Sequence, residues 1–188
     1  GWSITNNICS LRDLYQEKTS SEHLGHFFYD GEWEAATEHE EVICVKGEDD
    51  VTKTIVASRH GPIVDEILPP GTSETGPVSL RWLRAERGGW LESLLNMNRA
   101  RTAEEYRAST RSWHVPTFSL IFADTEGRIG YTCAGRIPIR EQHERGYRPG
   151  WDPEYEWQGL IAFEDLPHVF DPPRGWLASA NNRVAADD

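Results

Sequence analysis

A pair of apolar runs joined by a short turn sets the strongest limit on how this chain folds. Residues 117–123 (TFSLIFA) are rich in β-branched and aromatic side chains, and the turn-forming residues 124–127 (DTEG) follow them. A second run at 129–133 (IGYTC) comes after the turn. Two such runs with a short connection predict a β-hairpin, whose strands are antiparallel.

The same pattern recurs elsewhere with shorter runs, which are bounded by glycine and acidic turn residues. The predicted strand pairs are 27–29 with 32–35 around Asp30-Gly31, and 42–45 with 52–56 around the acidic turn 47–50; single extended pieces are expected at 2–5, 62–64 and 176–180.

Helical signals are confined to two stretches. Leu91, Leu94 and Leu95 share one face of a predicted helix at 90–98, and Thr102 precedes an acidic first turn at 102–111. Strands therefore dominate and the few helices are peripheral, which predicts an α+β fold built mainly of antiparallel sheet. Residues 140–175 carry many Pro, Gly, Trp and Asp, so we expect an ordered, loop-rich arm there.

Composition excludes several classes of protein. The 188 residues carry 19 Lys and Arg against 31 Asp and Glu, a net charge of −12, which disfavours binding to nucleic acid or to anionic membranes. No apolar run approaches the roughly 20 residues that a bilayer requires, and no leader opens the sequence. Cys9, Cys44 and Cys133 lack the spacing of a disulfide framework or a zinc site, so we interpret them as small hydrophobes.

Most polar clusters have an ordinary structural explanation. His60 lies in an Arg-His-Gly-Pro step where Gly61 and Pro62 dictate the geometry, which indicates a structural role. Asp152 and Glu156, beside two tryptophans, could serve as glycosidase carboxylates, although nothing in the sequence sets their separation.

The most informative polar pair is Asn181-Asn182, at the end of the last predicted strand. A fixed side-chain amide can donate a hydrogen bond to a developing oxyanion, but an Asn pair at a strand end is also common turn chemistry. Nucleophile-elbow, P-loop and dinucleotide-binding motifs are absent from the sequence.

Taken in order, several segments resemble the β-chain of the penicillin acylase family, whose members are N-terminal-nucleophile amidohydrolases. The segments that carry the resemblance are WSITNN (2–7), DLYQE (13–17), EVICVKG (41–47), HGPI (60–63), FADTEGRIGY (122–131), GRIPIR (135–140), WQG (157–159), LP (166–167), PPRG (172–175) and ASANN (178–182).

The resemblance implies that residues 1–188 are a single partial domain, a central segment of the β-chain within the four-layer αββα fold. It implies an amidase that cleaves side-chain amides of β-lactam antibiotics or other N-acyl substrates. In this family an autoproteolytic precursor exposes an N-terminal Ser, Cys or Thr, which attacks the amide carbonyl with its own α-amine as base.

By position, the family's two oxyanion donors match the Asn181 side chain and the backbone N–H of Asn6, and a register error of one residue would select Asn182. No nucleophile is expected within this chain, because Ser3 takes the usual Gly position of the motif. The segment alone is therefore expected to be inactive, with the α-chain and the rest of the β-chain as its partners and a small-molecule amide as substrate.

Many family members also bind a structural calcium ion. Asp13 and the carbonyl of Pro138 match that site, but Ser10 stands where an Asp is usual. Since calcium takes six or more oxygen ligands, no cofactor is expected in the segment alone, and calcium stays open for the full-length enzyme.

The resemblance does not identify the acyl group, because penicillin, cephalosporin and acyl-homoserine-lactone acylases share this scaffold. It suggests the bacterial periplasm or secretion. An alternative from another class is a non-catalytic, Trp-rich β module that binds carbohydrate or protein.

Overall fold

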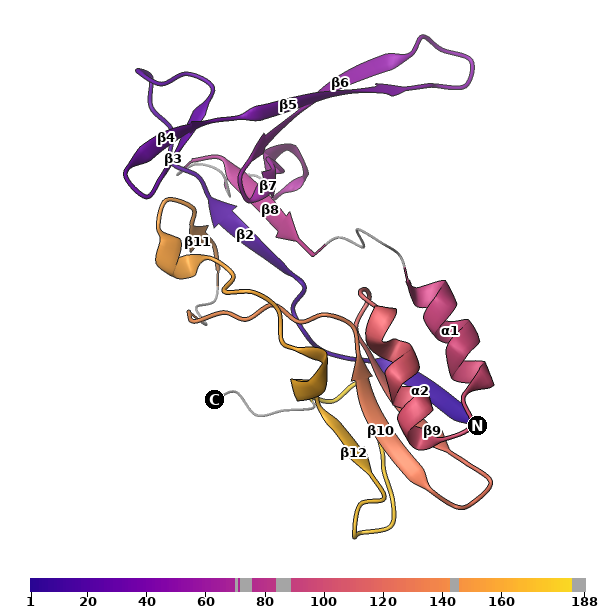
Figure 1. Cartoon of the computed structure of the whole chain (residues 1–188). Coiled ribbons are helices and arrows are strands. Elements are labelled where there is room, and N and C mark those ends of the chain that lie inside the picture. Colours follow the sequence, from indigo (N-terminus) through magenta and orange to yellow (C-terminus); the bar gives the residue numbers. More distant parts are fainter. Residues whose placement is uncertain (70, 72–75, 84–88, 143–145, 184–188) are drawn as a thin grey trace. The chain divides into compact units, whose positions relative to one another are not determined.

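The structure is a computed structural model that describes residues 1–69, 71, 76–83, 89–142 and 146–183 (Figure 1). It divides into two compact units, each built from separate stretches of the chain. Unit 1 comprises Gly1–Leu11, Leu83–Ile139 and Gly159–Asp188, and unit 2 comprises Arg12–Trp82 and Arg140–Gln158. The predicted arm 140–175 is thus shared between the units, and the expectation of one partial domain stays a prediction.

Unit 1 contains a four-stranded antiparallel sheet. Its central hairpin, β9 (Phe118–Ala123) and β10 (Ile129–Ala134), confirms the prediction for residues 117–133. The edge strand β1 (Trp2–Asn6) pairs with β9, and β12 (His168–Phe170) pairs with β10.

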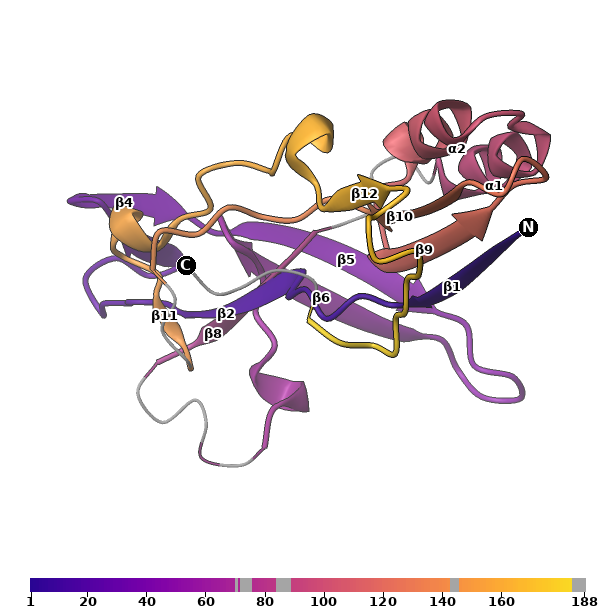
Figure 2. The ribbon, with the colours of Figure 1, turned by 90° about the horizontal axis from the view of Figure 1, so that it is seen from below.

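Two helices cover one face of this sheet (Figure 2). They are α1 (Trp90–Arg99) and α2 (Ala103–Ser109), and a short 3₁₀ turn, η2 (Thr110–Ser112), follows the second. Thr102 caps α2, since its hydroxyl accepts a hydrogen bond of 3.1 Å from the Glu105 N–H. Both helical predictions are therefore confirmed.

The core of unit 1 lies between the helices and the sheet. Leu120 and Phe122 of β9 pack with Met97, Tyr106 and Trp113 from the helical side. The rings of Tyr106 and Phe122 are 4.4 Å apart, a spacing at which aromatic pairs attract.

The segment after β12 corrects one prediction. Residues 176–180 are predicted to form a short strand, but the structure gives these residues no strand assignment. A sequence can favour extended backbone by itself, whereas a strand also needs a hydrogen-bonded neighbour. Here the segment is joined to β1 through side chains.

Unit 2 is built from a small sheet and two hairpins. In the sheet, β2 (Arg12–Gln16) lies between the antiparallel β8 (Val78–Trp82) and the parallel β11 (Arg148–Pro149). The hairpin β3 (His26–Tyr29)–β4 (Glu32–Ala35) confirms the turn prediction at Asp30-Gly31. The second hairpin, β5 (Thr37–Ile43)–β6 (Val51–Ser58), continues into β7 (Gly61–Pro62).

Short 3₁₀ turns complete the described chain at η1 (Asp65–Ile67), η3 (Pro153–Tyr155) and η4 (Phe163–Asp165). The structure is thus mostly antiparallel sheet with two α-helices, consistent with the predicted α+β class. No helix in the described ranges is long and apolar enough to cross a membrane.

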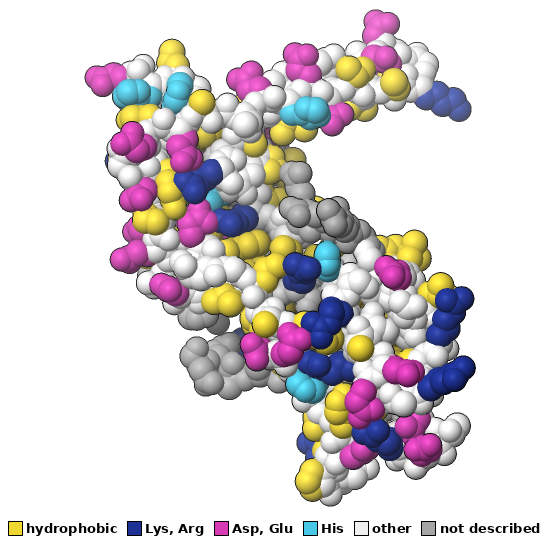
Figure 3. Space-filling view, in the orientation of Figure 1, with side chains coloured by type: hydrophobic (Ala, Val, Ile, Leu, Met, Phe, Trp, Pro, Cys, Tyr) yellow, Lys and Arg dark blue, Asp and Glu magenta, His cyan; other side chains and the backbone are white. Residues whose placement is uncertain are grey.

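The β5–β6 hairpin is exposed along its length. Every residue of β5 is exposed, and acidic side chains follow the hairpin in the space-filling view (Figure 3). Val42 and Ile43 are also exposed, at 60% and 51%. The acidic residues of this strand lie in solvent, where like charges discourage pairing with other sheets.

Truncating the core of unit 1 tests this packing. Leu120 is fully buried in the core cluster, so Leu120→Ala is expected to lower the free energy of unfolding by about 2–5 kcal/mol. Leu91 on α1 is 65% exposed, and Leu91→Ala is the matched control with little expected effect. Urea unfolding followed by circular dichroism measures both, and equal losses would contradict the proposed core.

Candidate active site

The backbone N–H of Asn6 faces the free edge of the described sheet. In the β1–β9 pair, Gly1 accepts from the Ala123 N–H and Asn7 donates to the Thr117 carbonyl. Hydrogen-bonded and non-bonded residues alternate along an antiparallel pair. The backbone N–H and C=O groups of the odd-numbered residues of β1 therefore point toward β9. Asn6 is even-numbered, and its N–H therefore points outward from the ladder.

The Asn181 side chain meets that outward N–H. The Asn6 N–H donates to the Asn181 Oδ1 over 2.9 Å, although the two residues are 175 positions apart. Asn181 has a φ of +55°, in the left-handed region that Asn tolerates better than most residues. This local turn carries the carboxamide to the edge of β1.

Among the described residues, the neighbouring Asn182 forms its hydrogen bonds within its own turn. Its Oδ1 accepts from the Ala180 N–H over 3.1 Å, and its Nδ2 donates to the Arg183 carbonyl over 3.0 Å. Of the two candidate donors, the structure brings Asn181, and not Asn182, to Asn6.

A buried polar contact holds the turn that follows Asn6. Asn7 is 7% exposed and donates from Nδ2 to the Cys133 sulfur over 2.8 Å, while the Cys9 thiol donates to its Oδ1 over 3.2 Å. Burial raises the pKa of Cys133 to about 12. Because nucleophilic attack requires the thiolate, Cys133 is a structural thiol.

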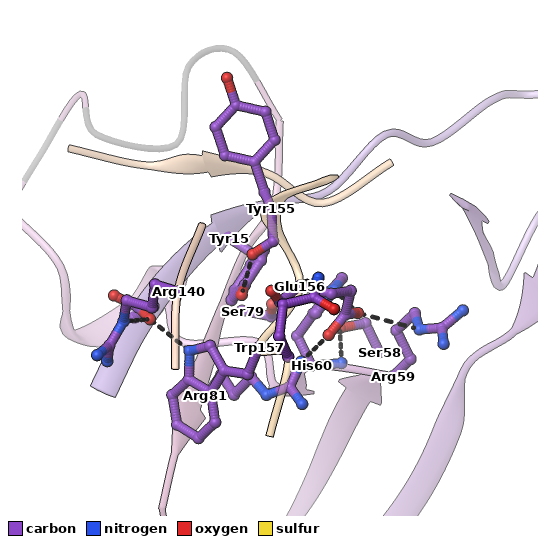
Figure 4. Close-up of polar contacts among 12 residues, drawn as sticks. Tyr15, Ser58, Arg59, His60, Ser79, Arg81, Arg140, Tyr155, Glu156 and Trp157 are labelled. Carbon is purple, nitrogen blue, oxygen red and sulfur yellow. Dashed lines mark hydrogen bonds and ion pairs between the residues drawn. The ribbon is translucent and has the colours of Figure 1, made fainter. Parts of the chain in front are cut away.

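Unit 2 contains a second polar cluster, on one face of β2. Successive side chains of a strand alternate between faces, so Asp13, Tyr15 and Glu17 project to the same side. Tyr15 is fully buried and its hydroxyl donates to the Tyr155 carbonyl over 2.8 Å. Figure 4 shows these contacts, which join β2 to the arm around residue 156.

Within this cluster a histidine links two carboxylates. His60 Nδ1 lies 2.8 Å from Glu17 Oε1, and His60 Nε2 lies 2.9 Å from Glu156 Oε1. The His60 ring also stacks on Tyr15 at 4.0 Å. Ser58 and Ser79 donate to the same Glu17 oxygen over 2.5 and 2.6 Å.

The charges of this cluster shift the pKa values of its members. Burial alone would lower the pKa of His60, but the hydrogen bonds to Glu156 and Glu17 outweigh it and raise the pKa. For Glu156, burial opposes ionisation, yet the hydrogen bond from His60 and the charge of Arg81 lower the pKa to about 2. The His60 imidazolium and the Glu156 carboxylate are thus stabilised in their charged forms.

The sharp step at Gly61 places His60. Gly61 has a φ of +137°, and a Cβ there would lie 2.3 Å from the Leu80 carbonyl oxygen. Only glycine lets the chain pass β8 this closely. The interpretation of His60 as structural agrees with its side chain being 1% exposed, out of reach of a substrate.

Asp13, the predicted calcium ligand, is engaged by hydrogen-bond donors. Its carboxylate accepts from Arg140 Nε over 2.7 Å and from Trp157 Nε1 over 2.5 Å, and Arg148 Nε lies 3.2 Å away. The two guanidinium groups beside this carboxylate do not fit a calcium site, which requires oxygen ligands. In the described part of the chain, no three His, Cys, Asp or Glu side chains gather to hold a metal.

Pro138, the other residue that matches the calcium site, belongs to unit 1, as does Ser10, which departs from the family pattern, whereas Asp13 belongs to unit 2. Pro138 forms an isolated bridge with Leu160. Calcium bound by Asp13 and Pro138 in the full-length protein stays a prediction.

The two carboxylates considered for glycoside chemistry have separate structural roles. Asp152 caps η3 by accepting from the Glu154 N–H over 3.0 Å, and Glu156 is ion-paired with His60 and Arg81.

Sequence reasoning missed Glu17, Arg81 and Arg148 as members of a cluster. The alternation Asp13-x-Tyr15-x-Glu17 was the available signal, since three polar residues on one face of a strand need partners when buried.

Comparison with known proteins places the chain in a family. The penicillin amidase family profile matches residues 1–188. Penicillin acylase 2 proenzyme of Pseudomonas sp. (strain SE83) is 33% identical over 190 residues, which is 100% of this chain and 24% of that protein. Acyl-homoserine lactone acylase QuiP of Pseudomonas syringae pv. tomato is 30% identical over 186 residues, 97% of this chain and 22% of that protein.

A solved structure of a penicillin acylase is also similar to this chain. The thermostable penicillin G acylase from Alcaligenes faecalis superimposes with a TM-score of 0.81 at 27% identity, covering 100% of this chain and 33% of that chain. The chain belongs to the penicillin amidase family. It spans less than a quarter of the length of the curated relatives described above.

The pH dependence of stability tests the His60 cluster. Because the folded-state pKa of His60 is raised above its unfolded value, its stabilisation is complete below about pH 6.5 and is lost as the pH rises through the folded-state pKa. His60→Gln is expected to lower the free energy of unfolding by about 3–5 kcal/mol at pH 6, and by less at pH 9.

His39 provides the matched control. It lies 2.9 Å from Glu41, but its side chain is 70% exposed, so His39→Gln is expected to change stability little at either pH. Urea unfolding at several pH values and NMR titration of the His60 ring measure these effects. A His60 pKa at or below 6.5 would contradict the assignment.

Proposed function

We propose that this chain is part of an N-terminal-nucleophile amidohydrolase with the αββα fold, and that Asn6 and Asn181 supply its oxyanion hole. The observation that carries the proposal is the 2.9 Å hydrogen bond between the outward Asn6 N–H and the Asn181 carboxamide. Membership of the penicillin amidase family and the resemblance at WSITN and ASANN support it.

The proposed substrate is a small N-acyl compound, a β-lactam antibiotic or another side-chain amide. A Ser, Cys or Thr outside this chain attacks the amide carbonyl and forms an acyl–enzyme bond, and its α-amine takes the proton. The C–N bond then breaks and the amine leaves with that proton. Water finally hydrolyses the acyl enzyme and restores the nucleophile.

The tetrahedral intermediates carry negative charge on the former carbonyl oxygen. Two N–H donors, the backbone of Asn6 and the Nδ2 of Asn181, would stabilise that charge. In the resting arrangement the Asn181 Oδ1 occupies the acceptor position in front of the Asn6 N–H. A substrate oxygen takes this position when the carboxamide rotates and presents its Nδ2 group.

The remaining polypeptide of a larger acylase is the proposed partner of this chain. Coverage of 22–24% of the curated relatives supports a segment role. The exposed apolar residues of the β5–β6 hairpin, Val42, Ile43 and Val51, are consistent with further chain packing there. Calcium, where the full-length enzyme binds it, would require Asp13 to exchange its arginine contacts.

Substitutions at Asn181 test the oxyanion proposal in the full-length enzyme. Asn181→Asp keeps the shape and the acceptor for Asn6 but has no N–H donor, and Asn181→Gly keeps the left-handed backbone without a side chain. Each is expected to lower kcat by about 10²–10³-fold with a smaller change in KM. Steady-state hydrolysis of a chromogenic amide measures both constants.

The neighbouring residue supplies the control. Asn182→Ser retains an oxygen that can accept from the Ala180 N–H, so its kcat is expected to stay within about threefold of the parent, since a local turn contact adds no transition-state charge stabilisation. Unchanged kcat in both Asn181 variants would reject the proposed role of Asn181.

The isolated chain gives a second test. Purified residues 1–188 are expected to show no turnover of a chromogenic amide, because the proposed site supplies donors but no nucleophile. The same preparation must show cooperative unfolding, so that inactivity is not a consequence of misfolding. Turnover that follows the concentration of this chain would overturn the proposal that the nucleophile lies elsewhere.

A further inference from the structure

Side-chain hydroxyl groups join the two segments that carry the proposed donors. The Thr5 Oγ1 lies 2.6 Å from the Ser179 Oγ, and both atoms belong to partly buried residues. Thr5 directly precedes Asn6, and Ser179 lies two residues before Asn181. This hydroxyl bridge therefore lies about one residue step, ~3.4 Å along the strand, from the proposed donor N–H.

Residues 175–181 run alongside β1 in the same direction. At one end, Trp176 and Leu177 share the lining of a hollow of about 510 Å³ with Trp2 and Ser3. At the other end, Ser179 contacts Thr5 and Asn181 contacts Asn6. Residues 175–181 are described by the structure and belong to no strand. Side-chain contacts therefore determine which residues of this segment lie beside which residues of β1.

The two members of the bridge are fixed from different sides. Thr5 is held by its register opposite Ser119 of β9, whereas Ser179 belongs to a segment without ladder pairing. The bridge thus restrains the segment that carries Asn181 by attaching it to a strand of the sheet. Without the bridge, the hydrogen bond between Asn6 and Asn181 itself has to hold the carboxamide at the edge.

We infer that Thr5 and Ser179 are positioning residues for the oxyanion donors, an inference that rests on the proposed function of Asn6 and Asn181. They contact each other through their hydroxyl groups, and they act by fixing the distance between the Asn6 N–H and the Asn181 carboxamide. Catalysis by fixed donors is sensitive to such placement, because a misplacement of about 1 Å can cost about a hundredfold in rate.

The test removes and restores the hydroxyl groups in the full-length enzyme. Thr5→Val is close to isosteric and is expected to lower kcat by about ten- to a hundredfold, with KM changed less than about threefold. Ser179→Ala is expected to act similarly. The double variant is expected to be no slower than the slower single variant, because either change already removes the whole bridge. Thr5→Ser keeps a hydroxyl and is expected to restore most of kcat.

Another hydroxyl pair in unit 1 provides a matched control. The Ser93 and Ser112 hydroxyls lie 2.9 Å apart, between α1 and η2. Ser93→Ala removes a bond of the same kind from the helical side of the unit, and it is expected to leave kcat unchanged. Thermal unfolding of each variant, measured on the processed enzyme, separates a loss of stability from a loss of positioning.

The outcomes separate this inference from the proposed function. If Asn181→Asp lowers kcat while Thr5→Val and Ser179→Ala do not, the hydroxyl bridge has no positioning role and the oxyanion proposal stands. If Asn181→Asp leaves kcat intact, the oxyanion proposal itself fails. If the Thr5 and Ser179 effects on kcat multiply in the double variant, the two residues act independently and the inference is overturned. Should Thr5→Val fail to mature, the comparison of Thr5→Ser with Ser179→Ala decides.

Discussion

The pairing of β1 with β9 determines which backbone groups unit 1 offers at its edge. Trp2 lies opposite Phe122 and Asn6 opposite Phe118, so the register of the edge strand is tied to the packing of β9 on the helices. A shift by one residue would move every side chain of β1 to the other face. It would also turn the Asn6 N–H toward β9. The apolar core therefore fixes the direction of the Asn6 N–H, one of the two proposed oxyanion donors.

In unit 2, buried polar side chains hold separate segments of the chain together. Glu17 is 2% exposed, and a single one of its oxygens accepts from two serine hydroxyls and faces His60. An ionised carboxylate without such partners would cost several kcal/mol to bury. The motif at residues 13–17, one of the segments that carry the family resemblance, thus holds the arm around Glu156 against β2. Its members contribute to the scaffold of unit 2.

Local patterns predicted the hairpin at 117–133 and both helices, because turn residues, helix caps and apolar spacing act over a few positions. The strand predicted at 176–180 was wrong, since extended backbone forms a strand only beside a partner. Asn6 and Asn181 could be named only through the family resemblance, because no local pattern relates residues 175 positions apart. The link from Glu17 through His60 to Glu156 was beyond prediction for the same reason: its members come from three separate stretches of chain.

The resting contact between Asn6 and Asn181 bears on how such a site distinguishes substrate from transition state. The Asn181 Oδ1 is an amide oxygen, chemically similar to the carbonyl of an amide substrate. Replacing one by the other at the Asn6 N–H exchanges one neutral hydrogen bond for another, so we expect a small change in free energy. Once the substrate oxygen becomes anionic, the same N–H makes a charge-assisted hydrogen bond, roughly twice as strong as a neutral one. The gain then falls almost entirely on the transition state, which is the condition under which binding raises kcat rather than lowering KM.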